Sequence, residues 1–118
     1  MLFSFMRAKI HLASVTQKDL NYVGSITIDE AILEKVEMYP NERVQVLNLN
    51  NGKRFETYII KGKKNTGVIG LNGPAARMAE IGDKVIIVAY GYGTKEEIIS
   101  VHPKIVVLNE KNEVIKEE

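Results

Sequence analysis

Gly24 and Ser25 are the pair of residues in this sequence whose types and order most directly permit chemistry. The Ser25 hydroxyl lies one bond from the carbonyl of Gly24, and a glycine there leaves that carbonyl open to attack and widens the available backbone conformations. Backbone strain at such a point can be part of a mechanism, and the chemistry would be cleavage of the peptide bond between the two residues. Gly-Ser is also a common turn dipeptide, so the pair alone leaves both interpretations open.

Polar residues that share one side of a predicted strand are the other candidates. Arg54, Glu56 and Tyr58 alternate along the chain, so one face of a strand would carry a cation, an anion and a phenol. Lys9 and His11 alternate in the same way on another predicted strand. A solvated outer face gives the same patterns, so they indicate a site only together with the glycine–serine pair.

The composition excludes several classes of function. At 118 residues, with 45% apolar and 26% charged residues, the chain is expected to fold as one soluble globular domain. A net charge of +1 without a basic stripe argues against nucleic-acid binding. The absence of cysteine removes disulfides, thiolate nucleophiles and cysteine-based zinc sites, and the two histidines have no partners at metal-ligand spacing. With no signal peptide or membrane-spanning stretch, the expected location is the cytoplasm.

The elements that must position these residues are mostly strands. Residues 43–49 and 53–60 are predicted to form a hairpin around Asn51-Gly52. From residue 6 to residue 12, apolar residues alternate with polar ones, which places Leu12 on the apolar side. Asp29 is expected to cap a short helix, and a second short helix is predicted over 94–100. The tail after Leu108 is polar and is expected to fray at its end.

The sequence also contains a weak internal repeat. PNERVQVLNL and IGDKVIIVAY (40–49 and 81–90) each combine a turn, an acidic residue, a basic residue and an apolar strand. Two such units suggest a small barrel with internal pseudo-symmetry, although turn residues before valine-rich strands are also common.

Five stretches carry a resemblance to a known family. AKIH (8–11), LNYVGSITIDE (20–30), NNGKRFETYII (50–60), LNGPAAR (71–77) and IGDKVII (81–87) resemble, in order and spacing, the pyruvoyl-dependent aspartate 1-decarboxylases. The resemblance implies a mainly β fold, a small six-stranded double-psi β-barrel with short helices. It also implies decarboxylation of L-aspartate to β-alanine and CO2 for pantothenate and coenzyme A biosynthesis. A cytoplasmic homotetramer with sites at subunit interfaces is implied as well.

The resemblance also gives the glycine–serine pair a role. In this family the precursor cuts itself at the matching bond, which here would leave a 1–24 β chain and a 25–118 α chain. The Ser25 hydroxyl attacks the Gly24 carbonyl to give an ester, elimination follows, and loss of ammonia leaves a pyruvoyl group at position 25. That group forms a Schiff base with the substrate and takes the place of pyridoxal phosphate, and no metal is implied.

Further site residues carry over by position. Tyr58 matches the family's proton donor, and Arg54 and Lys9 match cations that hold carboxylates. The other matches are substrate-binding Thr57, Gly73, Pro74 and Ala75, with Asn72, Tyr22 and the further candidate His11 lining the site.

Strict alternation would put Thr57 and Tyr58 on opposite faces of their strand, so both can serve one site only through strand twist or where subunits meet. Three positions depart from the family's usual residues: Pro74 replaces alanine and removes a backbone N–H, Gly70 replaces cysteine, and Leu12 replaces arginine.

Two alternatives stay open beside the decarboxylase. One is a catalytically silent small barrel that binds a partner or a ligand. The other is a self-cleaving protein that stops at the ester or hydrolyses it, which would leave an ordinary serine at the new N-terminus.

Overall fold

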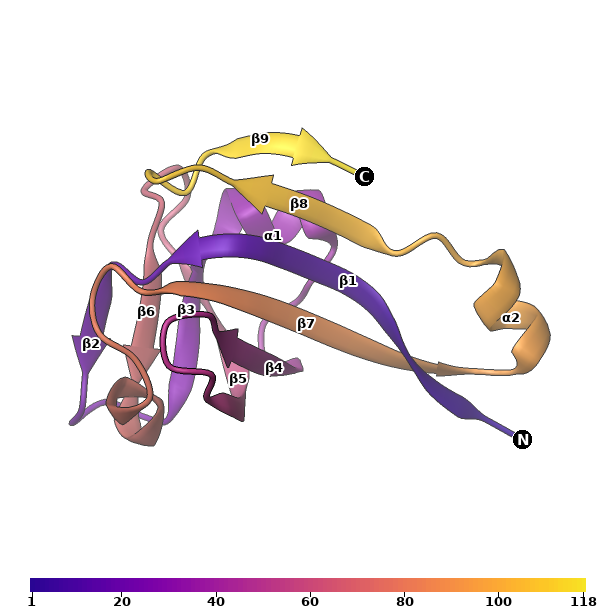
Figure 1. Cartoon of the computed structure of the whole chain (residues 1–118), viewed down its shortest axis with the longest axis horizontal. Coiled ribbons are helices and arrows are strands. Elements are labelled where there is room, and N and C mark those ends of the chain that lie inside the picture. Colours follow the sequence, from indigo (N-terminus) through magenta and orange to yellow (C-terminus); the bar gives the residue numbers. More distant parts are fainter.

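A computed structural model describes residues 1–118 and shows a mainly β protein with short helices (Figure 1). The predicted fold class is therefore confirmed in its β content. In chain order the elements are β1 (Phe3–Ser14), β2 (Gln17–Asp19), β3 (Ser25–Asp29), α1 (Glu30–Val36), β4 (Arg43–Asn48), β5 (Arg54–Gly62), β6 (Ile69–Asn72), the 3-10 helix η1 (Gly73–Arg77), β7 (Lys84–Gly93), α2 (Lys95–Ser100), β8 (Lys104–Leu108) and β9 (Val114–Glu117). No helix is long and apolar enough to cross a membrane.

The strands pair in the order β2-β6-β3-β5-β4-β7-β1-β8-β9. Six of them, β6 to β1, are consecutive in this order and form the barrel, in agreement with the expected number of six, while β2, β8 and β9 extend the sheet beyond it. The polar tail forms one of these added strands. Its end was expected to fray, yet β9 pairs with β8 in an antiparallel ladder that includes Val107↔Lys116 and Leu108↔Val114. The edge of β8 offers main-chain hydrogen bonds that the tail takes up although its side chains are exposed.

The sheet closes on itself where β1 ends. Thr16 N donates to Ile69 O at 2.8 Å, and Thr16 Oγ1 accepts from Ile69 N at 3.0 Å. Close to this contact, Asn112 Nδ2 donates both to Ser14 O and to Gly67 O, at 2.9 and 2.8 Å. These bonds join the two ends of the six-strand run, and the barrel encloses one core cluster of 22 buried apolar residues.

Local sequence explains α1 and the β4–β5 hairpin. The Asp29 carboxylate caps α1 by accepting from Ala31 N at 2.8 Å, as predicted, and the helix buries Ile32, Leu33 and Val36 against the barrel. The predicted hairpin is confirmed, with Val46 paired to Phe55.

The two turns before β4 and β7 have the same hydrogen bonds. Glu42 N donates to Tyr39 O, and Glu42 Oε1 accepts from Tyr39 N, both at 3.1 Å. Asp83 N donates to Glu80 O at 3.0 Å, and Asp83 Oδ2 accepts from Glu80 N at 2.9 Å. Hydrogen bonds from Asn48 and from the Glu80 N–H hold the pKa of the Asp83 carboxyl below its usual value.

Each turn is also tied to a neighbouring strand end in the same way. Asn41 N donates to Ile59 O, and Gly82 N donates to Val15 O, both at 2.8 Å. Ile59 and Val15 donate back to the acidic residue of the turn at 3.1 and 3.0 Å. Asn41 and Gly82 both have positive φ, 71° and 94°, the conformation that favours asparagine and glycine. The internal repeat in the sequence is therefore a structural pseudo-symmetry.

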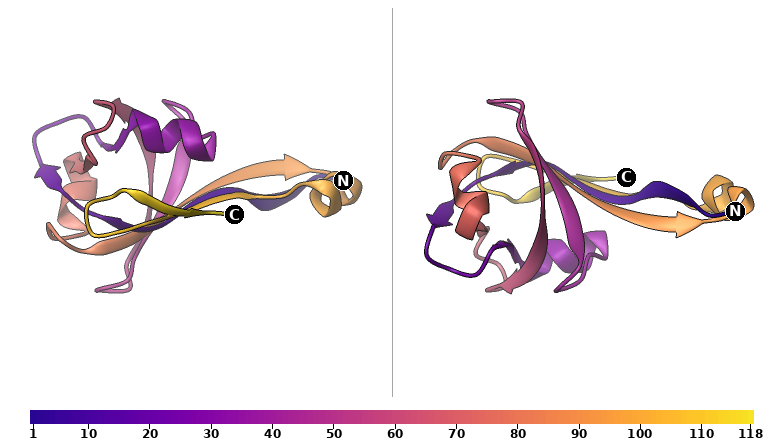
Figure 2. Two further views of the ribbon diagram at one scale, coloured as in Figure 1. Left: turned by 90° about the horizontal axis from the view of Figure 1, so that it is seen from above. Right: turned by 90° about the horizontal axis from the view of Figure 1, so that it is seen from below.

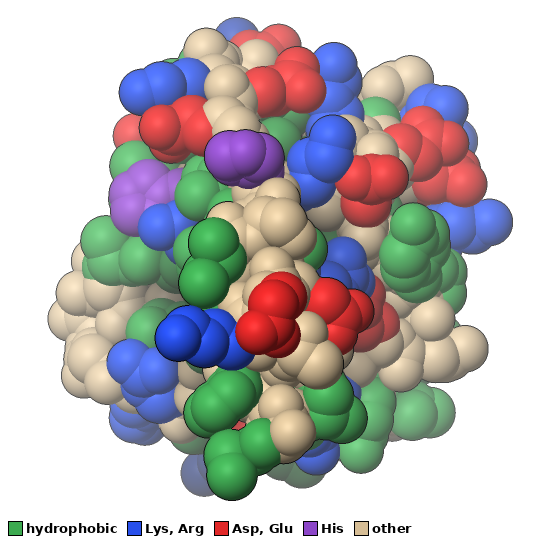
Figure 3. All heavy atoms as spheres, turned by 90° about the vertical axis from the view of Figure 1, so that its right-hand side faces the viewer, with side chains coloured by type: hydrophobic (Ala, Val, Ile, Leu, Met, Phe, Trp, Pro, Cys, Tyr) green, Lys and Arg blue, Asp and Glu red, His purple; other side chains and the backbone are tan.

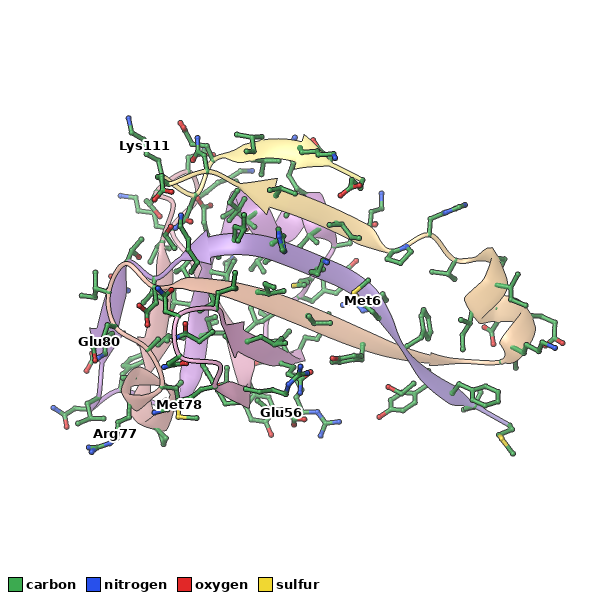
Figure 4. The ribbon with its side chains drawn as sticks, viewed as in Figure 1. Met6, Glu56, Arg77, Met78, Glu80 and Lys111 are labelled. Carbon is green, nitrogen blue, oxygen red and sulfur yellow. The ribbon has the colours of Figure 1, made fainter.

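An arm made of the start of β1, the end of β7 and α2 projects from the barrel (Figures 1 and 2). Its large apolar side chains are exposed: Phe3 by 47%, Tyr92 by 67% and Ile99 by 73%. Seen from that end, hydrophobic side chains lie among charged ones on the surface (Figure 3). Met6 lies on β1 near the point where the arm leaves the barrel (Figure 4).

The prediction that Leu12 lies on the apolar side of its strand is wrong. Ala8 and Ile10 are fully buried as the alternation requires, but a register shift between Ile10 and Ala13 interrupts it. Leu12 takes a left-handed φ of 63° there and is only half-buried, while Ala13 and Ser14 become buried next to it. A bulge inserts unpaired residues into one strand, so the side-chain alternation restarts beyond it.

Candidate active site

Ser25 opens β3 and is almost fully buried, with 1% of its surface exposed. Its hydroxyl donates to Val23 O at 2.8 Å and accepts from Asn72 Nδ2 at 2.9 Å. The antiparallel register pairs Ser25 with Asn72, so the contact follows from the sheet itself. No ionisable side chain hydrogen bonds to this hydroxyl.

Gly73 lies directly against the backbone of Gly24. A Cβ on Gly73 would come within 2.8 Å of Gly24 Cα and 2.9 Å of Gly24 N, and Tyr22 O would be 3.1 Å away. Gly73 also has a φ of 64°. Pro74 borders the same glycine, since its Cδ would lie 3.5 Å from a Cβ at position 24. The loop from β6 into η1 thus packs against the bond that the resemblance marks for cleavage.

Gly73→Ala should therefore block or strongly slow cleavage at this bond. The added methyl group has no room beside Gly24, and alanine is strained at positive φ. Intact-mass analysis would show mainly uncut chain. Gly52→Ala is the matched control, because Gly52 also has positive φ, 73°, but has open space around it. Equal cleavage of the Gly73→Ala variant and the control would contradict this packing argument.

A cavity of about 470 Å³ is lined by Asn72, the residue that donates a hydrogen bond to Ser25 Oγ. Two of the residues that line it, Tyr22 and Asn72, are site residues predicted from the sequence. The others were not predicted: Gln17, Lys18, Asp19, Thr27, Ile60 and Lys61. For Thr27 a signal was present, because it alternates with Ser25 on one strand and therefore shares its side of the sheet. The β2 residues had no such signal, since only the parallel pairing of β2 with β6 brings them there.

Tyr58 and Ser25 hold equivalent places on neighbouring strands. The parallel ladder of β3 and β5 begins with Ile26↔Ile59, so Ser25 and Tyr58 are the residues directly before it on the two strands. Tyr58 is 56% exposed, and its hydroxyl makes no hydrogen bond within the chain. Thr57 is buried on the opposite side of β5, as alternation predicts, so one chain does not present both side chains on one face.

Arg54 and Lys9 have no carboxylate partner, but neither contacts Ser25. Arg54 lies four residues before Tyr58, about 13 Å along β5, and donates to Gln45 Oε1 at 3.1 Å. Glu56 lies between Arg54 and Tyr58 in the sequence, and its Oε2 atom is 3.8 Å from Arg43 Nε. In Figure 4 Glu56 lies apart from Arg77 and Met78, which mark η1.

His11 and Ala75 complete the predicted set. His11 Nδ1 is buried and has no hydrogen-bond partner in the chain. Ala75 is buried in η1 and belongs to the core cluster. No group of three or more His, Cys, Asp or Glu side chains gathers in a way that could hold a metal ion.

The three departures from the family pattern have distinct surroundings. Pro74 lies at the start of η1. A backbone N–H at that position would have no partner within the helix, so its absence costs no helix hydrogen bond. A side chain at Gly70 would meet the flexible Gln17 side chain, with Cγ at 2.8 Å. Leu12 occupies the bulge of β1.

The sequence comparisons with known proteins all indicate one family. The family model described as "Aspartate decarboxylase" matches residues 1–115. "Aspartate 1-decarboxylase" of Listeria innocua is 60% identical over 114 residues, covering 97% of this chain and 90% of the relative. The protein of the same name from Bacillus cytotoxicus is 55% identical over 116 residues, covering 98% and 91%.

Among solved structures, the rationally designed mkDPBB_sym_86 protein is similar with a TM-score of 0.47 at 15% identity, covering 72% of this chain and 94% of the other. The match of the family model over nearly the whole sequence, together with these relatives, shows that the chain belongs to the aspartate decarboxylase family.

Proposed function

We propose that this protein converts L-aspartate to β-alanine and CO2 after cutting its own chain between Gly24 and Ser25. Membership of the aspartate decarboxylase family supports the reaction. The observation that supports the site is the buried Ser25 hydroxyl, which hydrogen bonds to Asn72 and to Val23 O. The residue before Ser25 is Gly24, which has no side chain.

The cleavage uses groups of the chain itself. Ser25 Oγ bonds to the Gly24 carbonyl carbon, the C–N bond breaks, and the result is an ester with a free amine at residue 25. Loss of the Ser25 α-proton breaks the Oγ–Cβ bond and releases the Gly24 carboxylate. Water then replaces the nitrogen, which leaves as ammonia, and a pyruvoyl group remains at the start of 25–118.

The surroundings of Ser25 fit such a group. The group needs no atoms from outside the chain except water, and the Asn72 N–H that now contacts Oγ is a donor suited to a carbonyl oxygen. A pyruvoyl group supplies an electrophilic carbonyl, the electron sink that decarboxylation requires and that no ordinary side chain offers.

The remaining roles belong to the side chains around it. Tyr58, which holds the place equivalent to Ser25 on the neighbouring strand and has a free hydroxyl, would return a proton to the substrate carbon after CO2 departs. Arg54 and Lys9, which have no carboxylate partner in the chain, would hold the substrate's carboxylates. Thr57 and the Gly73–Ala75 segment would bind substrate from the other side.

The working form is proposed to be a homotetramer with sites shared between subunits. A single chain leaves Lys9 and Arg54 away from Ser25 and puts Thr57 and Tyr58 on opposite faces. It also leaves the apolar arm exposed and His11 Nδ1 buried without a partner. A second copy packed on the arm would cover the exposed apolar side chains and could bring in the missing cations.

The decisive experiment adds L-aspartate to the mature protein without pyridoxal phosphate. The expected products are β-alanine and CO2, measured by chromatography and gas release, and light scattering of the same sample should give the mass of four chains. Intact-mass analysis should find two chains, the larger one without a free amine.

Other outcomes favour the alternatives. A single uncut chain without activity would favour a silent barrel. Cleavage that leaves an ordinary serine N-terminus, again without activity, would mean that the reaction stops at the ester. An active monomer would contradict the shared sites.

A further inference from the structure

The amide of Asn72 is fixed between two hydroxyl groups. Its Nδ2 donates to Ser25 Oγ at 2.9 Å and to Thr27 Oγ1 at 3.0 Å, so both N–H bonds are used. The Asn72 Oδ1 atom makes no hydrogen bond within the chain. Asn72 is one of the residues that line the cavity of about 470 Å³. The nitrogen end of the amide therefore faces the hydroxyls of β3.

The direction of the bond to Ser25 follows from its other contact. The Ser25 proton is donated to Val23 O at 2.8 Å, so toward Asn72 the Ser25 oxygen acts as an acceptor. Thr27 takes the second N–H of the amide, which has no other acceptor in the chain. Without that acceptor the second N–H would be unsatisfied, and a rotation of the amide to satisfy it would weaken the bond to Ser25.

Packing determines which way Thr27 points. Thr27 lies two residues after Ser25 and on the same side of β3. Its methyl group occupies the space left by Gly62, since a Cβ on Gly62 would lie 2.9 Å from Thr27 Cγ2. A β-branched side chain has few rotamers, so seating the methyl against Gly62 directs Oγ1 toward Asn72.

We propose that Thr27 is a positioning residue for self-cleavage, acting through the Asn72 amide on Ser25 Oγ. An N–H donor on Oγ stabilises the negative charge that builds there as the hydroxyl loses its proton and attacks Gly24. Thr27 never contacts the reacting atoms; it keeps the donor aimed at them. This inference rests on the proposed cleavage at the Gly24–Ser25 bond.

The test compares Thr27→Val with Thr27→Ser. Valine keeps the shape and the methyl packing but removes the acceptor, whereas serine keeps the acceptor and removes the methyl. Precursor isolated at low temperature is warmed, and intact-mass analysis follows the loss of the 118-residue chain. Thr27→Val should cleave about tenfold more slowly than the natural protein, the effect of one net hydrogen bond. Thr27→Ser should stay within about threefold, as expected if the acceptor is retained.

Thr66→Val is the matched control. Thr66 also uses its hydroxyl, donating to Lys63 O at 2.7 Å, but it is exposed and lies in another loop, so the cleavage rate should not change. If Thr27→Val lowers the thermal midpoint substantially, Thr27→Ala removes the same acceptor without adding volume and should show the same slowing.

The outcomes separate the two proposals. If the natural protein does not cut itself, the proposed function fails before Thr27 is tested. If it cuts itself and both Thr27→Val and Thr27→Ala cleave at its rate, the positioning role is overturned. If Thr27→Ser is as slow as Thr27→Val, a hydroxyl at position 27 is not enough to hold the Asn72 amide in place, and the inference is wrong.

Discussion

Ser25→Ala should leave the protein as one chain of 118 residues under denaturing conditions. A methyl group can neither attack the Gly24 carbonyl nor leave in an elimination, so the expected effect is complete loss of cleavage and, with it, of aspartate decarboxylation. Denaturing electrophoresis and intact-mass analysis measure the first loss, and β-alanine formation measures the second.

Ser14→Ala is the matched control for this experiment. Ser14 is the other buried serine, 7% exposed, and its hydroxyl accepts from Lys84 Nζ at 2.7 Å. Its substitution removes a buried hydroxyl of the same kind at a distant strand end, and the chain should still split. Cleavage of the Ser25→Ala protein between residues 24 and 25 would rule out the proposed mechanism.

Tyr58→Phe should leave cleavage intact while turnover of aspartate falls by about 10²–10⁴-fold, the usual contribution of a positioned acid. The ring keeps its place directly before the β3–β5 ladder, and only the phenolic hydroxyl is lost. Because the Tyr58 hydroxyl makes no hydrogen bond within the chain, its removal should change the thermal midpoint little. Steady-state kinetics should show the loss in kcat.

Tyr39→Phe tests whether any exposed tyrosine behaves in this way. Tyr39 is 60% exposed, and its ring, which lies 5.9 Å from the Arg7 guanidinium, is retained in phenylalanine. This variant should keep full turnover. If Tyr58→Phe were fully active, another group would have to return the proton, although the cleavage at Ser25 could stand.

Several features could be predicted from short stretches of sequence, because the interactions that form them are local. Asp29 caps α1 from one residue before the helix, and the β4–β5 hairpin follows from Asn51-Gly52 between two apolar runs. The equivalence of the turns at Glu42 and Asp83 was visible because each turn makes its bonds three residues apart. The contact of Ser25 with Asn72 was predictable only through the family resemblance.

Other features depend on partners far away in the sequence. The tail became β9 because the edge of β8 was free to pair, which no property of the tail itself required. Leu12 left the apolar side because β1 had to bulge while pairing with β7. The cavity lined by Asn72 takes part of its wall from β2 only because β2 pairs with β6.

The sequence by itself thus determined the strands, the caps and turns, and the glycine–serine pair, all of which depend on residues within a few positions of each other. Only the tertiary structure decided which groups meet Ser25. The register of β3 on β6 brings Asn72 to Ser25 from 47 positions further along the chain, and Gly73 to Gly24 from 49 positions further along. Register also gave Thr27 its contact with Asn72. A hydrogen bond between distant strands depends on register, and register is settled by the packing of the whole barrel.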